Sequence, residues 1–355
     1  MKHLLDVTPP GGRPYPVLYG RDPATALVAV WQARWRQAAI IGDDTTIELF
    51  AKPIAEALRG RGCAVIELAF PPGEESKTRA TKEWLENELL HAGFGRHGCI
   101  VALGGGIALD VAGYVAATFM RGVAHVNVAT TLLAQVDAAI GGKTGVNTPL
   151  GKNLIGAFHH PRAVLIDLEA LESQGEVDLK NGLAEAVKHA VLRDEKLFAR
   201  LEEWAAGSGP IPDDVIVRSI AIKAEVVAED DRDSGLRNIL NFGHTAAHAI
   251  ETATDHATPH GYAVATGMVI EARLAQGAGW LDAGELERLI ALLDRIGLPV
   301  AAPCPFDAAL PFFAYDKKSD RGTIECAIPH KIGHIRAYDG RWTRAVTAEQ
   351  MRGAW

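Results

Sequence analysis

Residues 99–103 form an unbroken apolar run that leads directly into three glycines, Gly104 to Gly106, and a helical pattern begins at Ile107. A strand that is apolar at every position is typical of a parallel sheet covered on both faces. Glycines let a backbone approach a pyrophosphate closely, and the start of a helix offers free N–H groups and a positive dipole end. The segment therefore predicts an α/β fold with a nucleotide loop. Its spacing is GGGxxxD rather than GxGxxG, so a plain tight turn remains an alternative.

The two halves of the chain have different patterns. Strands are predicted at residues 38–42 and 64–68 and helices at 46–59 and 78–92, and this alternation indicates a parallel sheet with helices on both sides. Helical patterns dominate the second half, at residues 179–204, 213–229, 236–252, 262–278 and 283–296, followed by a small hairpin of 322–329 with 332–336. We therefore place an α/β nucleotide-binding domain at residues 1–177 and a mostly α-helical domain at 178–355.

Composition excludes several classes of protein. The chain has 355 residues and a net charge of −8, which disfavours binding to nucleic acids or anionic membranes. Its four cysteines are scattered with no CxxC pair, as expected of reduced, buried thiols rather than a disulfide framework. We find no leader-like start and no apolar stretch of about 18 residues, so we expect a cytoplasmic protein.

A histidine-rich segment indicates a metal site. His244 and His248 lie four positions apart, on one face of the predicted helix, and His260 follows after a short loop. Together with Glu185, two imidazoles and a carboxylate can hold a catalytic divalent metal with an open position. The alternative, a pair of histidines on a helix surface, is weakened by the polar residues Asn241 and Arg237 nearby.

Lysines flanked by glycines occur at Lys143 and Lys152, as suits close approach to a phosphate. The triplet Gly142-Lys143-Thr144 is similar to the end of a P-loop, but Asp137 occupies the position of the first P-loop glycine. We therefore reject an ATPase. A second strand-to-helix junction, residues 72–78, has a composition similar to the first, although a capped helix start explains it equally well.

Taken together, these motifs closely resemble those of the 3-dehydroquinate synthase family of sugar-phosphate cyclases. They occur in order from about Gly73 to Lys318: GExxKT, GGGxxxDxxGxxAA, RG, TTLLAQVD, GGKTGVN, GKNLIGxF, GLAExxK, GLRxxLNxGHTxxHAIE, HGxAVAxGM and DKK. The resemblance implies a dehydroquinate synthase-like fold, with an NAD-binding α/β domain, a helical metal- and substrate-binding domain and an active site in the cleft between them. It also implies a homodimer.

The resemblance also implies roles for individual residues. The metal, zinc or alternatively cobalt, is held by Glu185, His244 and His260. NAD contacts Gly73, Glu74, Lys77, Gly105, Gly106, Ile107, Asp110, Thr130, Thr131, Lys143, Lys152 and Ser173. The substrate meets Asp137, Lys143, Lys152, Asn153, Lys188, Lys223, Arg237, Asn241, His248 and one of Lys317 or Lys318, and Arg121 reaches its phosphate from the partner subunit.

The implied reaction converts 3-deoxy-D-arabino-heptulosonate 7-phosphate to 3-dehydroquinate and phosphate, a step of the shikimate pathway toward chorismate and the aromatic amino acids. It proceeds by transient oxidation with NAD, β-elimination of phosphate, reduction and intramolecular aldol closure. Tyr262, Asp233, Ala129, Ala247 and Ser173 depart from the usual family residues. Tyr262, beside a metal ligand, keeps open a sister cyclase making a valiolone or inosose ring. An iron-type polyol dehydrogenase and a non-catalytic binding protein are the remaining alternatives.

Overall fold

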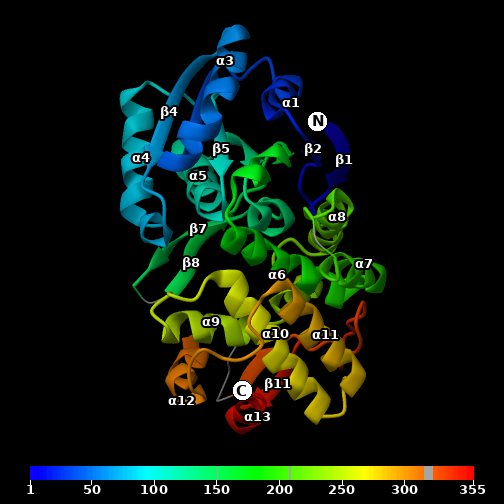
Figure 1. Ribbon diagram of the computed structural model, residues 1–355. Coiled ribbons are helices and arrows are strands. Elements are labelled where there is room, and N and C mark those ends of the chain that lie inside the picture. Colours follow the sequence, from blue (N-terminus) through cyan, green and yellow to red (C-terminus); the bar gives the residue numbers. More distant parts are fainter. Residues whose placement is uncertain (150, 208, 316–322) are drawn as a thin grey trace. The chain divides into compact units, whose positions relative to one another are not determined.

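The computed structural model describes residues 1–149, 151–207, 209–315 and 323–355. The chain forms two compact units (Figure 1). Unit 1 comprises Met1–Gly175 and Lys223–Asp231, and unit 2 comprises Glu176–Ile222 and Arg232–Trp355. Among the described residues, no helix is both long and apolar enough to cross a membrane.

Unit 1 is built on a seven-stranded sheet with the order β1-β2-β9-β6-β5-β3-β4. Neighbouring strands are parallel throughout, except that β1 and β2 are antiparallel. The strands are β1 (Lys2–Val7), β2 (Tyr15–Gly20), β3 (Gln37–Asp43), β4 (Ala64–Phe70), β5 (Cys99–Gly104), β6 (Ala124–Ala129) and β9 (Val164–Asp167). The predicted parallel sheet is confirmed, while β1, β2, β6 and β9 have no counterpart among the predicted elements.

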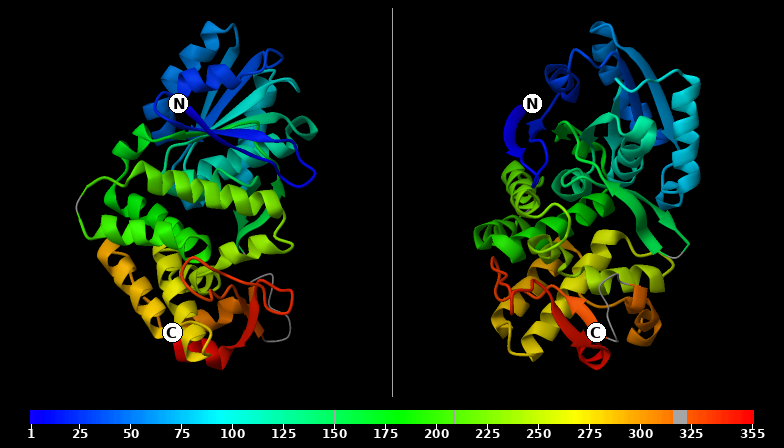
Figure 2. Two further views of the ribbon diagram at one scale, coloured as in Figure 1. Left: turned by 90° about the vertical axis from the view of Figure 1, so that its right-hand side faces the viewer. Right: turned by 180° about the vertical axis from the view of Figure 1, so that it is seen from behind.

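Helices cover both faces of this sheet (Figures 1 and 2). They are α1 (Pro23–Val30), α2 (Asp44–Thr46), α3 (Lys52–Gly60), α4 (Arg79–His91) and α5 (Gly106–Thr118), with a π-helical turn, η1 (Ile47–Ala51), joining α2 to α3. Short turns η2 (Glu74–Ser76), η3 (Phe119–Arg121), η4 (Ala134–Ala138) and η5 (Glu169–Ser173) complete the unit.

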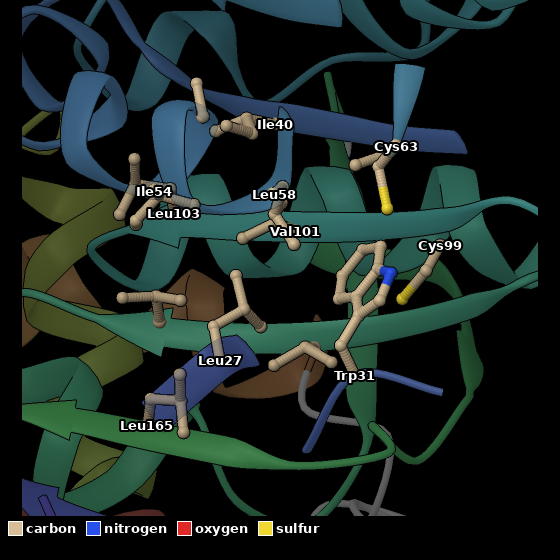
Figure 3. Packing of buried hydrophobic residues seen from close by; sticks show 14 of the residues in the cluster. Leu27, Trp31, Ile40, Ile54, Leu58, Cys63, Cys99, Val101, Leu103 and Leu165 are labelled. Carbon is tan, nitrogen blue, oxygen red and sulfur yellow. The ribbon is translucent and has the colours of Figure 1, made fainter. Parts of the chain in front are cut away.

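Strand β5 shows why an unbroken apolar run is needed at the centre of the sheet. Val101 and Leu103 belong to a core cluster that includes Leu27 of α1 and Leu58 of α3 (Figure 3). The alternate residues of β5 point to the opposite face, where α5 packs on the strand. Every residue of β5 is buried, so neither face tolerates a polar side chain.

An antiparallel hairpin lies between β6 and β9 in the chain. Strand β7 (Lys143–Thr148) pairs with β8 (Gly151–Phe158), and β7 packs against α5. The close approach of β7 to α5 is possible because Gly113 has no side chain. A Cβ at this position would collide with Thr144. The hairpin therefore holds Thr144, and Lys143 next to it, beside the helix that follows the Gly-rich loop.

Unit 2 is mostly helical, and α10 (His260–Gly277) lies at its centre, in contact with α6, α9, α11 and α13. The other helices are α6 (Glu176–Arg193), α7 (Glu195–Ala205), α8 (Asp213–Glu229, of which Lys223–Glu229 belong to unit 1), η6 (Leu236–Asn241), α9 (His244–Ala253), α11 (Ala283–Ile296), α12 (Phe306–Ala309), η7 (Leu310–Tyr315) and α13 (Ala348–Ala354).

Two predicted helices are interrupted in the structure. The helix predicted at 179–204 breaks at Asp194, whose carboxylate accepts hydrogen bonds from the backbone of Lys196 and Leu197 and so begins a new helix, α7. The helix predicted at 236–252 splits into η6 and α9 at Gly243, which has φ of 79°. A residue in this left-handed region cannot continue an α-helix.

The predicted hairpin of 322–329 with 332–336 is wrong. Strand β10 (Thr323–Cys326) pairs antiparallel with β11 (Arg344–Thr347) instead. Pro329 lacks the N–H that a paired strand position requires, and residues 331–334 close only a single isolated bridge.

We predict that Gly267→Ala destabilises unit 2. The new Cβ would collide with the carbonyl oxygen of Gly243, where α9 and α10 are in contact. Overpacking of this kind costs about 1–3 kcal/mol in the free energy of unfolding, which denaturant titration of the purified chain measures. The control is Gly277→Ala in the same helix, where nothing lies within 4 Å of the added Cβ. Equal stability of the two variants would contradict the prediction.

Candidate active site

The Gly-rich loop follows β5 and opens α5 in unit 1. Gly104 has φ of 140°, a conformation that other residues rarely adopt, and Gly105 is the N-cap of α5 with no side-chain cap. The N–H of Thr130, at the end of β6, donates to the carbonyl oxygen of Gly104 at 3.1 Å, and Thr131 lies next to Gly105. The predicted NAD residues of the two neighbouring strand ends therefore lie together at the carboxyl edge of the sheet.

Four polar side chains surround the start of α5. Lys77 and Asp110 are paired at 2.6 Å, and Asn147 of β7 donates to Glu74 at 2.6 Å. Burial raises the pKa of Asp110 above its ordinary value, against the opposing charge of Lys77. The backbone N–H of Asn147 also donates to the carbonyl oxygen of Lys77 at 2.8 Å. The loop before α4, helix α5 and the β7–β8 hairpin are thus connected through one polar network.

The predicted phosphate residues lie along the hairpin and the neighbouring turns. Lys143 is at the start of β7, opposite Phe158, whereas Lys152 and Asn153 follow Gly151 at the turn end. The two lysines therefore lie at opposite ends of the hairpin. Four residues of β7 separate them, and each residue of a strand adds about 3.4 Å to its length. Asn153 has φ of 54°, and its N–H donates to the side chain of Asn147 at 3.0 Å.

The remaining predicted residues of unit 1 are more widely placed. Asp137 of η4 pairs with Lys223 of α8 at 2.6 Å. Arg121 is exposed in the turn after α5, with φ of 65°. Ser173 donates its hydroxyl to the carbonyl oxygen of Ala170 at 2.7 Å. Asp137 and Lys223 thus form a second ion pair, in which the lysine is buried and the carboxylate half-buried. The residue after Ser173, Gln174, accepts a hydrogen bond from the N–H of Leu132 at 2.8 Å.

In unit 2, three helices bring Glu185, His244 and His260 together. Nε2 of each histidine lies 3.5 Å from Oε1 of Glu185, and one ligand atom from each residue falls within 4.8 Å of the others. Glu185 comes from α6, while His244 and His260 are the first residues of α9 and α10. Two imidazole nitrogens and one carboxylate are a donor set that fits zinc or cobalt. The residues present therefore fit a divalent metal.

Charge compensates for the burial of Glu185. Burial by itself raises the pKa of this carboxyl, but Lys188 and the two histidines outweigh it and hold the pKa well below its ordinary value. Lys188, one helical turn away, forms an ion pair with Glu185, and both side chains are buried. An ionised carboxylate is therefore ready to bind a cation.

A second carboxylate lies behind His260. Nδ1 of His260 is 3.5 Å from Oε1 of Glu251, at the far end of α9. Burial lowers the pKa of His260, but Glu185 and Glu251 together raise it to about 10, which shows that this position stabilises positive charge. Glu271 of α10 accepts hydrogen bonds from the N–H groups of Gly243 at 2.8 Å and Ala246 at 3.3 Å, and so fixes the start of α9 beside His244.

Other predicted substrate residues are distributed over unit 2. Arg237 on η6 is buried and pairs with Asp233 at 3.2 Å. Asn241 ends the same turn, and the ring of His248 lies 5.6 Å from that of His244 on the exposed side of α9. Lys317 and Lys318 lie outside the described residues.

Sequence reasoning missed two contributors. The sequence motifs assign no role to Glu251, although this residue follows His244 by seven positions and therefore lies on the same face of α9. Asn147 lies within a recognised motif, but its hydrogen bond to Glu74, 73 residues away in the chain, is seen only in the folded structure.

Comparisons with known proteins decide the family. The model of the 3-dehydroquinate synthase N-terminal region matches residues 67–181, and that of the C-terminal region matches residues 182–319. The chain belongs to the 3-dehydroquinate synthase family. The 3-dehydroquinate synthase of Nitrosococcus oceani is 43% identical over 311 residues, 86% of each chain. That of Symbiobacterium thermophilum is 42% identical over 335 residues, 92% of this chain and 94% of the relative.

Solved structures of sugar-phosphate cyclases share the fold. A 2-deoxy-scyllo-inosose synthase complexed with carbaglucose-6-phosphate, NAD+ and Co2+ has a TM-score of 0.89 and 26% identity, covering 99% of this chain and 98% of that one. The 2-epi-5-epi-valiolone synthase of Streptomyces hygroscopicus, with NAD+ and Zn2+ bound, has a TM-score of 0.85 and 28% identity, covering 96% and 95%. The glycerol dehydrogenase of Schizosaccharomyces pombe, at 16% identity and a TM-score of 0.64, shares the fold alone.

We predict that Glu251→Gln weakens metal binding by about 10- to 100-fold, because a carboxylate behind a histidine ligand orients the ring and raises its basicity. Competition against a chromophoric chelator measures zinc affinity without any assay of turnover. Asp255→Asn, an exposed change just beyond α9, is the matched control and should leave the affinity unchanged. Wild-type affinity in Glu251→Gln would show that the contact has no role in metal binding.

Proposed function

We propose that this chain converts 3-deoxy-D-arabino-heptulosonate 7-phosphate to 3-dehydroquinate and phosphate. The observation that carries the proposal is the group of Glu185, His244 and His260, in which the carboxylate is buried and both histidines are half-buried. It occurs in a chain whose two halves both match 3-dehydroquinate synthase models. The enzyme is a lyase that depends on NAD and a metal and acts on a small sugar phosphate.

We assign NAD to unit 1 and the metal to unit 2. When bound, NAD accepts a hydride and returns it, and the metal polarises the hydroxyl to be oxidised. In unit 1, the glycines and the start of α5 provide a cradle for the pyrophosphate of NAD, and the Lys77–Asp110 pair fixes the walls of that cradle. In unit 2, Glu185, His244 and His260 hold the metal, and zinc or cobalt satisfies the same donors.

Anionic groups of the substrate are assigned to the cations that the sequence singles out. The phosphate is bound by Lys143 at one end of the β7–β8 hairpin or by Lys152 and Asn153 at the other, and Arg121 contributes from the partner subunit. Lys223 and Arg237 bind the carboxylate. Each of these two cations is positioned by a carboxylate of the chain, Asp137 and Asp233 respectively, so that its side chain is ordered before substrate arrives. Asn241 and His248, near the metal group, hydrogen-bond to the substrate's hydroxyls and shift protons between them.

A sister cyclase is the second candidate, favoured by one observation. Tyr262 lies in the first turn of α10, two residues after the ligand His260, where the family usually has an acid. Sequence identity favours the first candidate: the curated 3-dehydroquinate synthases reach 46%, against 28% for the valiolone synthase. The polyol dehydrogenases share only the fold.

We also propose that the enzyme works as a cytoplasmic homodimer. Met120 and Arg121 both have positive φ, at 50° and 65°, and Met120 is 41% exposed. A strained turn that presents an apolar side chain and an arginine suits contact with a second copy. Sedimentation of the purified chain tests the dimer.

We expect phosphate release from 3-deoxy-D-arabino-heptulosonate 7-phosphate with catalytic NAD and zinc, and none from sedoheptulose 7-phosphate or glucose 6-phosphate. A chelator should abolish the reaction, and no net NADH should accumulate because the hydride is returned. A colorimetric phosphate assay with parallel absorbance at the NADH band measures both. Release from a control sugar alone would assign the chain to a sister cyclase, and stoichiometric NADH would make it a dehydrogenase.

We predict that Lys143→Ala lowers turnover at least about tenfold while metal content stays at the wild-type level, since a hydrogen bond to a charged group contributes about 1.5–3 kcal/mol. Steady-state kinetics and metal analysis of the same sample measure the two quantities. Lys52→Ala, an exposed change in α3, is the control. Wild-type turnover in Lys143→Ala would remove the phosphate assignment.

A further inference from the structure

Three arginines gather at the edge of the sheet opposite to the Gly-rich loop. Arg13 precedes β2, Arg34 precedes β3 and Arg162 precedes β9. These strands run in one direction, so their starts lie at the amino edge of the sheet. The Gly-rich loop follows the end of β5, at the carboxyl edge. The arginine cluster is therefore separate from the proposed NAD site.

The arginines line one cavity. Its volume is about 470 Å³, and its walls are the three arginines, His159, His160, Pro161 and two glycines, with no aspartate or glutamate. Within the described part of the chain, the guanidinium groups of Arg13, Arg34 and Arg162 form neither ion pairs nor hydrogen bonds with other side chains. Burial lowers the pKa of Arg162, and the positive charges of Arg13 and Arg34 lower it further. Like charges thus face one another in a protein whose net charge is −8.

Two histidines fix the floor of the cavity. His159 stacks on His125 with ring centroids 5.0 Å apart, and its Nε2 lies 2.9 Å from the carbonyl oxygen of Val123. His125 is 1% exposed, and its Nδ1 has no hydrogen-bond partner among the described residues. Nε2 of His160 lies 3.2 Å from Asp231, and the ring stacks on Tyr15. Packing therefore orders the two histidines, while no carboxylate among the described residues pairs with the arginines.

We infer that this cavity binds a small oxyanion with two or more negative charges, either a phosphate ester or a dicarboxylate. Guanidinium groups bind both through paired, charge-assisted hydrogen bonds. Such a ligand would reduce the mutual repulsion of three cations that form no ion pair with the described residues. The volume falls within the range of about 300–1,000 Å³ that is typical of small-molecule sites. The site is additional to the proposed catalytic function and does not depend on it.

The test uses the full chain loaded with zinc and NAD, titrated calorimetrically at low ionic strength with inorganic phosphate and, separately, with succinate. Because phosphate also binds the proposed catalytic site, both titrations are repeated in Lys143→Ala. We expect binding to persist in Lys143→Ala and to weaken at least tenfold when Arg34→Gln and Arg162→Gln are added. Arg61→Gln, an exposed change in the same unit, should leave binding unchanged.

The outcomes separate the two ligand sources and the two sites. Binding of phosphate alone assigns phosphate esters, binding of succinate alone assigns dicarboxylates, and binding of both assigns the shared oxyanion chemistry. Loss of all binding in Lys143→Ala, or no effect of the arginine changes, would overturn the proposal. Arg13→Gln, at an exposed position, repeats the test if the double change unfolds the chain. Turnover measured on the same samples reports the proposed function independently.

Discussion

A buried carboxylate needs positive charge around it, and in unit 2 that requirement organises the structure around Glu185. An ionised group without partners in the interior would cost several kcal/mol. Glu185 is fully buried, and the chain places Lys188 one turn away and the rings of His244 and His260 against it. The positions of the two histidines relative to Glu185 depend on how the helices pack. The close contact of α9 with α10 at Gly243 and Gly267, and the capping of α9 by Glu271, provide that control.

In unit 1, one sheet carries different groups of residues at its two edges. At the carboxyl edge, glycines and a helix start leave backbone N–H groups available to a nucleotide. At the amino edge, three arginines line a cavity whose described walls contain no carboxylate. The apolar strand β5 separates these edges and admits no polar group along its length. The same sheet can therefore present two unlike chemical surfaces.

Sequence reasoning succeeds where one periodic signal determines the element. The apolar run of β5, and the long patterns of α8 and α11, appear in the structure as predicted. It fails where the decisive contact is distant in the chain. The pairing of β10 with β11 depends on residues about twenty positions apart, and the break at Gly243 depends on the helix that packs against it. The contact between Glu251 and His260 likewise arises only when α9 and α10 are folded together, so no local pattern reveals it.

The three proposed ligands come from three different helices, and this has a thermodynamic consequence. An ion held by α6, α9 and α10 binds the folded unit and finds no such arrangement in the unfolded chain. By mass action, a metal at one thousand times its dissociation constant then adds about 4 kcal/mol to the free energy of unfolding. That is a large share of the roughly 5–15 kcal/mol that holds an ordinary domain together. The metal ion that takes part in the reaction would thus also stabilise the folded protein, and the lifetime of the protein would depend on the supply of metal.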